Sequence, residues 1–146
     1  MIYTPKTKIA MKLCFDAHKE QRDKSGLTYV FHPFHLAVQM KDEATTIVAL
    51  LHDVAEDTDM TLEQISEFGF GEEVMSALEL MTHSDDVPYL DYVRAIKPNP
   101  IARAVKLADL KHNSDLSRLD EVTPKALQRR EKYLQAIALL EDEGEE

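Results

Sequence analysis

The sequence predicts an all-α protein, a bundle of about seven or eight short helices. Apolar residues recur at intervals of three and four positions along most of the chain, and no segment shows the alternation typical of a β-strand. Only four glycines and six prolines interrupt these segments. A length of 146 residues favours a single domain that buries a core without the help of disulfides. We expect this domain over residues 1–140, followed by an acidic tail at residues 141–146.

The helices are expected where a start signal precedes a periodic apolar segment. The first begins at Thr4, an N-cap residue that proline follows, and ends before Gly26. Its expected inner face carries Ile9, Leu13 and Ala17. The second has Pro33 as its first residue, the third covers residues 42–55, and the capping-box pattern TLEQ opens a fourth at Thr61. The later helices are expected over residues 72–82, 87–96, 98–116 and 123–141.

The composition excludes several classes of protein. Asp and Glu number 27 against 17 Lys and Arg, a net charge of −10, so we expect neither nucleic acid nor an anionic membrane as partner. The one cysteine, Cys14, allows no intramolecular disulfide and no cysteine-based zinc site. The N-terminal segment does not read as a signal peptide, and no apolar run reaches the length of about 18 residues that indicates a membrane span. A cytoplasmic protein is expected.

Two residue types that bind metals follow directly on an apolar helical segment in ATTIVALLHDVAEDT. These are His52 and Asp53, and Glu56 and Asp57 each come four positions later, on the same helix face as one of the pair. Carboxylates at the C-terminal end of a helix are disfavoured by the helix dipole, and a divalent cation would offset this. The segment is therefore either part of a cation site or a solvated acidic helix end.

Two further segments carry candidate ligands. His32, in SGLTYVFHP, is expected at the N-cap of its helix with its side chain directed away from the helix start. Asp109 interrupts the apolar part of VKLADLKHN, where a carboxylate needs a partner, either a cation or a nearby Lys or Arg, and Asn113 lies one turn later. Two imidazoles and two carboxylates with positions left for water suit Mn²⁺ or another borderline divalent ion. Such an open site indicates hydrolase chemistry.

The sequence resembles the HD-domain metal-dependent phosphohydrolase superfamily, and within it the RelA/SpoT-type hydrolase domains and the small alarmone hydrolases. The similar strings are AHKEQRDKSGLTYVFHP, LLHDVAEDTDMTLEQISEFGFG and VKLADLKHN, in the family order within residues 4–113. The resemblance implies an HD-domain helical bundle that removes the 3′-pyrophosphate of ppGpp or pppGpp, giving GDP or GTP and pyrophosphate. It implies Mn²⁺ as cofactor, with another divalent cation possible, and as metal ligands His32, His52, Asp53 and Asp109.

The resemblance also implies roles for residues that hold no metal. Glu56 and Asp57 would be the catalytic acids that position or deprotonate the attacking water. Contacts with the substrate are implied for Lys24, Ser25, Asn113 and Tyr133. An acidic protein that binds a polyanion also needs local positive charge, for which the candidates besides the metal are Arg22, Lys24, Lys106 and Lys111.

The chain departs from the usual residues of the family beside the expected nucleotide. Asp23 replaces an arginine that packs on the guanine base, Thr28 replaces a proline, and Asp115 and Leu116 replace an Arg-Thr pair near the ribose. Two alternatives therefore stay open. One is an HD-family nucleotidase or phosphohydrolase that acts on another nucleotide, and the other is a nucleotide-sensing domain without turnover. A small nucleotide is the expected partner in every case.

The other histidines have simpler expected roles. His18 could approach the site from the first helix, but it is expected to be a satisfied histidine between helices. His35 is expected to support His32 or to pack beside it, whereas His83 and His112 are expected to be exposed.

Overall fold

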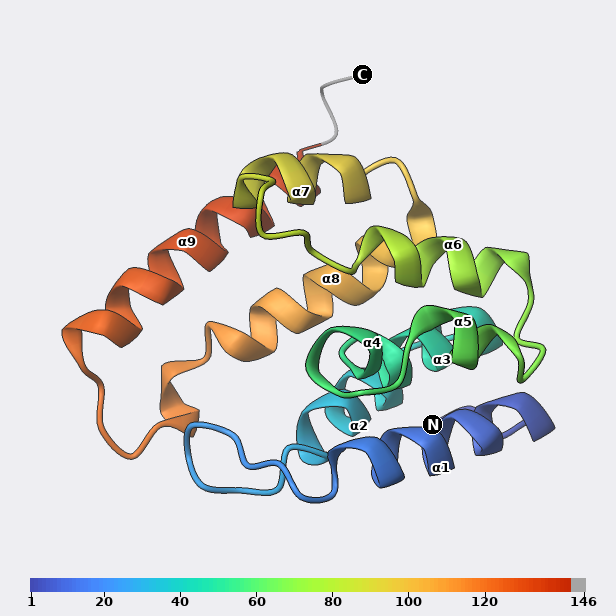
Figure 1. Cartoon of the computed structure of the whole chain (residues 1–146). Coiled ribbons are helices and arrows are strands. Elements are labelled where there is room, and N and C mark those ends of the chain that lie inside the picture. The colour runs from blue at the N-terminus through green and yellow to red at the C-terminus, as the bar shows by residue number, and fades with distance from the viewer. Residues whose placement is uncertain (143–146) are drawn as a thin grey trace.

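The computed structural model describes residues 1–142, and its regular elements in this range are helices joined by irregular connections (Figure 1). Its one β-type pairing there is an isolated bridge between Arg22 and Thr28, so the all-α prediction is confirmed. None of the helices in these residues is both long enough and apolar enough to cross a membrane. In chain order the elements are α1 (Pro5–His18), α2 (Phe31–Val38), α3 (Glu43–Leu51), α4 (Val54–Asp57), α5 (Leu62–Ser66), α6 (Glu72–Leu80), α7 (Tyr89–Ile96), α8 (Pro100–Asn113), the 3-10 helix η1 (Leu116–Arg118) and α9 (Pro124–Glu141).

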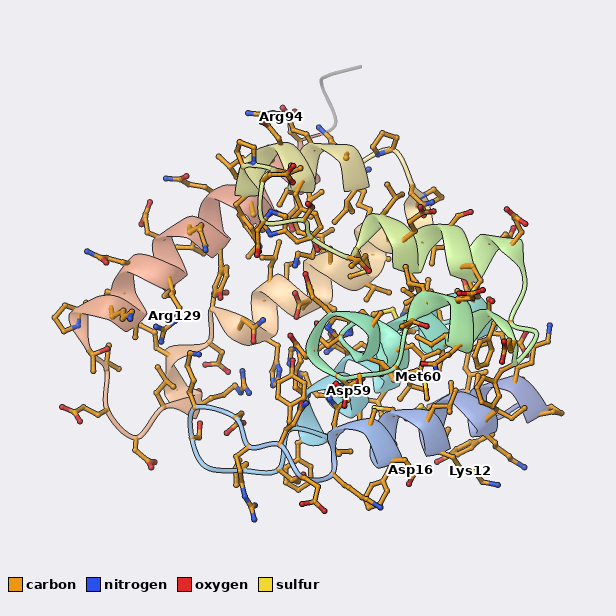
Figure 2. The ribbon with its side chains drawn as sticks, in the orientation of Figure 1. Lys12, Asp16, Asp59, Met60, Arg94 and Arg129 are labelled. Atoms are coloured by element: carbon orange, nitrogen blue, oxygen red, sulfur yellow. The ribbon has the colours of Figure 1, made fainter. Side chains whose placement is uncertain are left out.

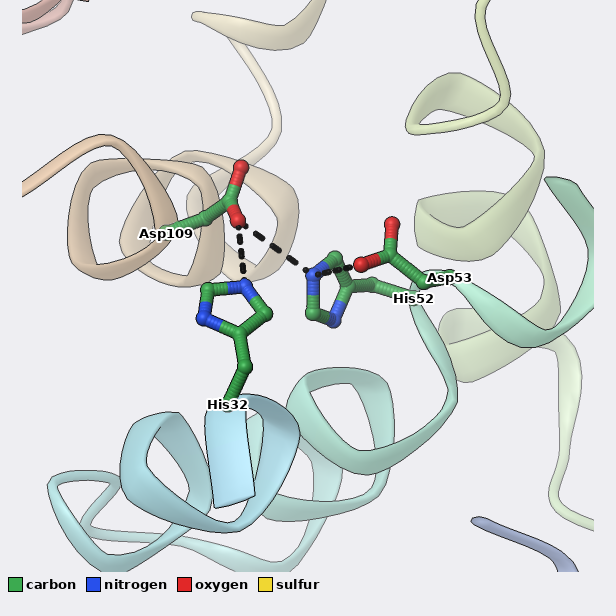
Figure 3. A group of neighbouring side chains, drawn as sticks. All are labelled: His32, His52, Asp53 and Asp109. Carbon is green, nitrogen blue, oxygen red and sulfur yellow. Dashed lines mark hydrogen bonds and ion pairs between the residues drawn. The ribbon is translucent and has the colours of Figure 1, made fainter. Parts of the chain in front are cut away.

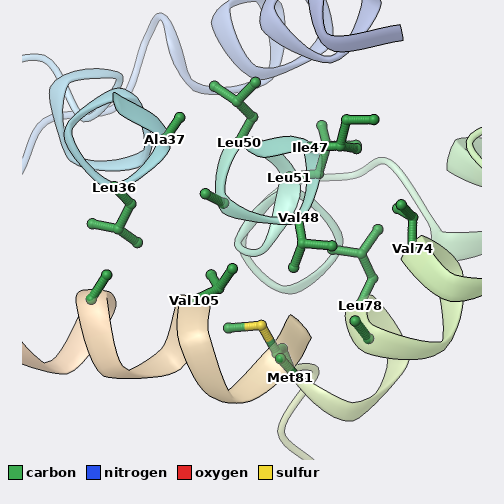
Figure 4. Packing of buried hydrophobic residues seen from close by; sticks show 14 of the residues in the cluster. Leu36, Ala37, Ile47, Val48, Leu50, Leu51, Val74, Leu78, Met81 and Val105 are labelled. Carbon is green, nitrogen blue, oxygen red and sulfur yellow. The ribbon is translucent and has the colours of Figure 1, made fainter. Parts of the chain in front are cut away.

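Helix α3 forms the centre of the bundle. All of its residues from Thr45 to Leu51 are buried, and it packs against α1, α2, α6 and α8. Figure 4 shows side chains of α2, α6 and α8 meeting those of α3 from several directions. Burying a leucine such as Leu50 or Leu51 stabilises the fold by about 1.5–3 kcal/mol. Because α3 is enclosed on all sides, the residues that follow its C-terminal end begin inside the molecule.

The segment expected as one helix over residues 42–55 is two helices. Helix α3 ends at Leu51, His52 and Asp53 form a turn, and α4 begins at Val54. The backbone of Asp53, with φ −101° and ψ −2°, departs from ideal α-helical angles at this turn. Helix α4 is a single turn closed by bonds from the Asp57 and Thr58 N–H groups to the carbonyls of Asp53 and Val54, at 2.9 and 3.1 Å. This break adds a helix to the number expected.

Side-chain caps explain where several helices begin. Each capping side chain accepts a hydrogen bond from a backbone N–H of the first turn, a contact that stabilises a helix by about 1 kcal/mol. The reciprocal capping box expected at Thr61 is present, and so is one at Thr4. The remaining capping residues are Asp42, Asn99 and Thr123 on α-helices and Asp115 on η1. At the other end of the chain, α9 includes Glu141, and residues 143–146 of the expected acidic tail lie outside the described part.

Helix α1 buries only part of the face expected. Ile9 is 37% exposed, Leu13 and Ala17 are half-buried against the core, and the buried positions are Thr7, Ala10, Cys14 and His18. Small side chains at positions 10 and 14 let α1 lie close against α3, which packs beside it. The helix also ends at His18, well before Gly26, so that the segment from Lys19 to Val30 forms an irregular connection to α2. Close packing therefore determined the buried face, rather than the size of the apolar residues.

Candidate metal centre

Four side chains from three parts of the chain meet inside the bundle. His32 comes from α2, His52 and Asp53 from the turn between α3 and α4, and Asp109 from α8 (Figure 3). One ligand atom of each lies within 4.8 Å of those of the other three. His32 and His52 are 2% and 4% exposed, and Asp109 is 6% exposed. The residues proposed from sequence as metal ligands thus form one compact cluster.

The position of His52 follows from the end of α3. Its Nδ1 lies 2.8 Å from the carbonyl oxygen of Ala49, which can only accept, so Nδ1 carries the hydrogen and Nε2 of the neutral ring has a lone pair. Nε2 lies 3.1 Å from Oδ2 of Asp53 and 3.5 Å from Oδ1 of Asp109. It has no hydrogen-bond partner of acceptable geometry among the described residues. A buried lone pair that faces two carboxylates fits a cation site.

His32 was expected to be the N-cap of its helix, but it is the second residue of α2. Turn hydrogen bonds at Phe31 and His32 lead directly into the helix, and Pro33 is tolerated in the first turn. Nε2 of His32 lies 2.8 Å from Oδ1 of Asp109, and Nδ1 lies 2.7 Å from Nδ1 of His112. Burial, and after it the charge of Arg118, lowers the pKa of His112 to about 4, so its neutral ring can accept a hydrogen from His32. With its hydrogen on Nδ1, His32 would present the Nε2 lone pair to a cation held beside Asp109.

The carboxylate of Asp109 divides its two oxygens between different partners. Oδ2 lies 3.0 Å from Nζ of Lys106, whereas Oδ1 faces the two imidazoles and accepts from the side-chain amide of Asn113 at 3.1 Å. The two partners considered from sequence, a cation and a lysine, can therefore be present together. Burial raises the pKa of Asp109, but Lys106 and the imidazoles outweigh it and hold the pKa well below its usual range. Lys106, considered as a contact for substrate, is only 9% exposed and already paired.

Asp53 is also ionised in this buried setting. Burial raises its pKa, but the neighbouring His52 outweighs this effect and brings the pKa to about 2. The hydroxyl of Tyr29 donates to Oδ2 of Asp53. Burial, and next the charge of Asp53, raises the pKa of Tyr29, so this hydroxyl keeps its proton. The carboxylates of the buried Asp109 and the half-buried Asp53 lie close together and require positive charge, which a divalent cation would supply.

The same charges act on His52. Burial lowers its pKa, but Asp53 and Asp109 together raise it well above 6.5. A proton on Nε2 and a divalent cation would neutralise the same two carboxylates and would therefore exclude one another. The donor set, two nitrogens and two oxygens with no thiolate among them, suits a divalent cation of intermediate softness.

The two candidate catalytic acids lie on α4, next to the cluster, but they face different surroundings. Oε2 of Glu56 accepts a hydrogen bond of 2.8 Å from the backbone N–H of His83. The ring of His83, which was expected to be exposed, is half-buried and stacks on Tyr92. Asp57 instead lines a cavity beside the cluster. Burial is the main cause that raises the pKa of both acids, and the charge of Asp53 adds to it.

This cavity has a volume of about 410 Å³, within the range of small-molecule sites. His32 and Asp57 belong to its wall, so it borders both the metal cluster and α4. The four residues proposed from sequence as substrate contacts also line it, namely Lys24, Ser25, Asn113 and Tyr133. The structure thus gathers residues from distant parts of the chain, from Lys24 to Tyr133, around one cavity.

Two arginines in the cavity wall were missed from the sequence. Arg129 projects from α9 (Figure 2), and Arg118 ends η1. The guanidinium of Arg118 donates to the carbonyl of His112 at 3.0 Å and lies 3.4 Å from Oδ2 of Asp23. Oδ1 of Asp23 accepts from the N–H groups of Ser25 and Leu27 at 2.8 and 3.0 Å. Asp23 therefore shapes the loop and pairs with Arg118.

Of the two other basic residues considered from the sequence as substrate contacts, one lies at the cavity and one does not. Arg22 lines the cavity. Lys111 lies 3.1 Å from Glu141 of α9 and is absent from the cavity wall. Arg118 carried no sequence signal because it follows an irregular segment, and only the return of the chain after α8 brings it opposite Asp23.

Comparison with known protein families matches residues 10–112 to the HD domain. Human MESH1, named a guanosine-3′,5′-bis(diphosphate) 3′-pyrophosphohydrolase, is 39% identical over 120 residues, which cover 73% of this chain and 65% of that protein. MESH1 of Xenopus tropicalis is 33% identical over 141 residues, covering 86% and 77%. A probable guanosine-3′,5′-bis(diphosphate) 3′-pyrophosphohydrolase of Synechocystis is 34% identical over 142 residues, and this chain spans only 18% of its length.

A solved structure agrees with these relationships. A metazoan orthologue of SpoT, described as hydrolysing ppGpp, matches with a TM-score of 0.73 and 25% sequence identity, over 96% of this chain and 85% of that one. The helical fold and the His-His-Asp-Asp cluster define an HD-type protein. Within this class, the chain belongs to the HD-domain family in the branch that contains the MESH1 proteins.

Proposed function

We propose that this protein hydrolyses the 3′-pyrophosphate of guanosine alarmones, converting ppGpp to GDP and pppGpp to GTP with release of pyrophosphate. The observation that carries the proposal is the junction of a four-ligand cluster with a cavity that holds every substrate residue expected from the sequence. The names of the MESH1 relatives and the activity of the structural neighbour support the same reaction. The proposed location is the cytoplasm, which suits a nucleotide substrate and a chain with one buried free cysteine.

The proposed cofactor is Mn²⁺, held by His32, His52, Asp53 and Asp109. Imidazole nitrogens together with carboxylate oxygens suit this ion better than they suit Mg²⁺, which prefers oxygen alone. When bound, such a cation polarises a phosphoryl oxygen and lowers the pKa of a water molecule.

The chain's own acids would handle the protons of the reaction. Asp57, which lies in the cavity wall and has a raised pKa, would accept a proton from the water that attacks the phosphorus next to the ribose. The bond from this phosphorus to the ribose 3′-oxygen breaks, and the 3′-oxygen takes up a proton and leaves as the hydroxyl of GDP or GTP. Glu56, held by the N–H of His83, would keep the second carboxylate of α4 in a fixed orientation beside the site.

The cationic wall of the cavity would bind the anionic part of the nucleotide. Lys24, Arg118 and Arg129 give this wall positive charge in a protein whose net charge is −10. Asn113 and Tyr133 lie in the same wall and would contact the ribose and its surroundings.

The test is a product assay with purified protein and Mn²⁺. We expect pyrophosphate release from ppGpp and pppGpp and none from a simple phosphomonoester such as p-nitrophenyl phosphate. Orthophosphate released from the monoester would instead support a nucleotidase, and tight binding of ppGpp without any product would support a nucleotide sensor. Chelation with EDTA followed by Mn²⁺, Mg²⁺ or Zn²⁺ should restore the activity best with Mn²⁺.

A further inference from the structure

Helix α4 is too short to hold its own orientation. It has four residues, and an isolated helical turn in water is unstable because few bonds offset the fixed backbone. Yet both candidate catalytic acids belong to it. Contacts from outside the helix must therefore fix the direction in which Asp57 faces the cavity.

One such contact comes from the irregular segment after α1. The side-chain NH₂ of Gln21 donates a hydrogen bond of 2.9 Å to the backbone carbonyl of Asp57, 36 positions along the chain. Because this carbonyl only accepts, the other end of the amide, Oε1, must face away from it. Oε1 lies 2.8 Å from Nδ1 of His18. The orientation of the Gln21 amide is thus fixed from both ends.

His18 completes the connection from inside the protein. It is the last residue of α1, is fully buried, and has its ring centre 5.0 Å from that of Tyr29, whose hydroxyl donates to Asp53. Since Oε1 of Gln21 accepts, Nδ1 of His18 must donate and carry the hydrogen. Burial lowers the pKa of His18, which favours the neutral ring. Its Nε2 is buried without a hydrogen-bond partner among the described residues, unlike the satisfied histidine expected from the sequence.

Resting on the proposed function, we propose that His18 and Gln21 are positioning residues for the hydrolysis. Through Nδ1 of His18, the amide of Gln21 and the carbonyl of Asp57, they fix the single turn of α4 and so the direction of the Asp57 carboxylate. Neither residue belongs to the metal cluster, and neither lines the cavity. Their loss should therefore change the rate of the chemical step and leave metal and substrate binding as they are.

The first test replaces Gln21, which is half-buried and outside any helix, so that its variants should fold. Gln21→Met removes both hydrogen bonds, and Gln21→Glu keeps an acceptor for His18 but places an oxygen against the Asp57 carbonyl. We expect both to lower kcat by about ten- to a hundredfold, the effect of a small misplacement of a reacting group, with KM and the Kd for Mn²⁺ within about twofold of wild type. Gln39→Met is the matched control, since Gln39 donates to the carbonyl of His35 within the region of α2.

A second pair of variants tests His18 itself. The side-chain amide of asparagine can place an N–H where Nδ1 of histidine lies, so His18→Asn should retain most of the rate. His18→Leu removes the donor and should lower kcat as far as Gln21→Met does. Equal losses in both His18 variants, with Gln21→Met at the wild-type rate, would overturn the proposal and leave His18 a packing residue.

The decisive measurements separate positioning from general stability. In an Asp57→Asn background, Gln21→Met should lower kcat no further, because its effect passes through Asp57; a full additional loss would overturn the proposal. Amide exchange at Asp57 and Thr58, whose N–H groups close α4, should become about tenfold faster in Gln21→Met at an unchanged Tm. Unchanged exchange would overturn the inference whatever the substrate is. Absence of ppGpp turnover in the wild-type protein would instead overturn the proposed function, and the exchange result would still decide whether Gln21 holds α4.

Discussion

The metal cluster and the cavity beside it are built from different kinds of structure. The four ligands come from α2, α8 and the end of the enclosed helix α3, so the hydrophobic core fixes their positions. The cationic wall of the cavity comes largely from irregular segments, where Lys24 lies in a loop and Arg118 at the end of η1. With this arrangement, substitutions in the loops of the cavity wall can change which nucleotide binds, while the rigid metal cluster keeps the same reaction. Metal-site substitutions should therefore abolish activity, and those in the wall should alter substrate affinity.

The largest effect is expected at the rigid centre. Asp53→Ala removes one of the four expected ligands, so bound Mn²⁺ after dialysis should fall below about a tenth of an equivalent and the rate should fall by at least about a thousandfold. Metal content by mass spectrometry and the pyrophosphate assay measure both. Asp16→Ala is the control, since Asp16 is an exposed carboxylate on α1. Full metal content with full activity in Asp53→Ala would end the assignment of this cluster.

The next largest effect is expected on α4, which joins the two regions. Glu56→Gln and Asp57→Asn should keep the metal and lower kcat by about 10²–10⁴-fold, because each removes a proton acceptor without touching a ligand. Steady-state kinetics with Mn²⁺ content measured on the same samples will show the separation. An unchanged kcat in either variant would remove that residue from the catalytic acids.

The pH dependence of metal binding probes the centre in another way. In the metal-free protein the pKa of His52 lies above 6.5, so a proton must leave Nε2 before a cation binds. Affinity for Mn²⁺ should therefore rise by about tenfold per pH unit from pH 6.5 upward until His52 is deprotonated, and then level off. Without metal, stability should fall as the pH rises through the raised pKa, because the folded state gives up a proton it had bound more tightly than the unfolded chain. Titration calorimetry measures the affinity for Mn²⁺ at each pH, and the Tm in EDTA measures the stability of the metal-free protein. An affinity and a Tm that do not change with pH would contradict this account.

The smallest effect is expected in the cavity wall. Arg118→Ala removes a charge that Asp23 and the His112 carbonyl hold in place, so KM for ppGpp should rise by about tenfold while kcat and metal content stay near wild type. Arg94→Ala is the control, since Arg94 pairs with Asp91 on the exposed side of α7. A kcat loss as large as that of Asp57→Asn would contradict the division between the two regions.

Sequence patterns predicted what depends on local chemistry. The N-caps that begin several helices are local features, and so is the change from apolar to polar residues at His52. Each can be recognised from a few neighbouring residues. Asp109 stood out because a carboxylate interrupts an apolar helix. These patterns were sufficient for the all-α class, whereas the choice of the four residues that cluster also needed the resemblance to the HD-domain family.

What depends on tertiary contact was not predictable in this way. The inner face of α1 was misjudged because close approach to α3 favours Ala10 and Cys14 over the larger Ile9. Lys106 was a candidate for binding the anionic nucleotide, but α8 turns it inward against Asp109. Gln21 and Arg118 act on residues 36 and 95 positions away, so no short window of sequence could reveal either contact.

The separation of His32 and Asp109 by 77 positions has a consequence for the life of the protein in the cell. An ion bound between them would act as a reversible cross-link across more than half of the chain, joining α2 to α8 and both to the turn after α3. Free energy of binding then adds to the free energy of unfolding, by about 4 kcal/mol when the ion is present at a thousand times its Kd. Metal starvation would thus reduce how much of the protein survives proteolysis, as well as how fast each molecule works.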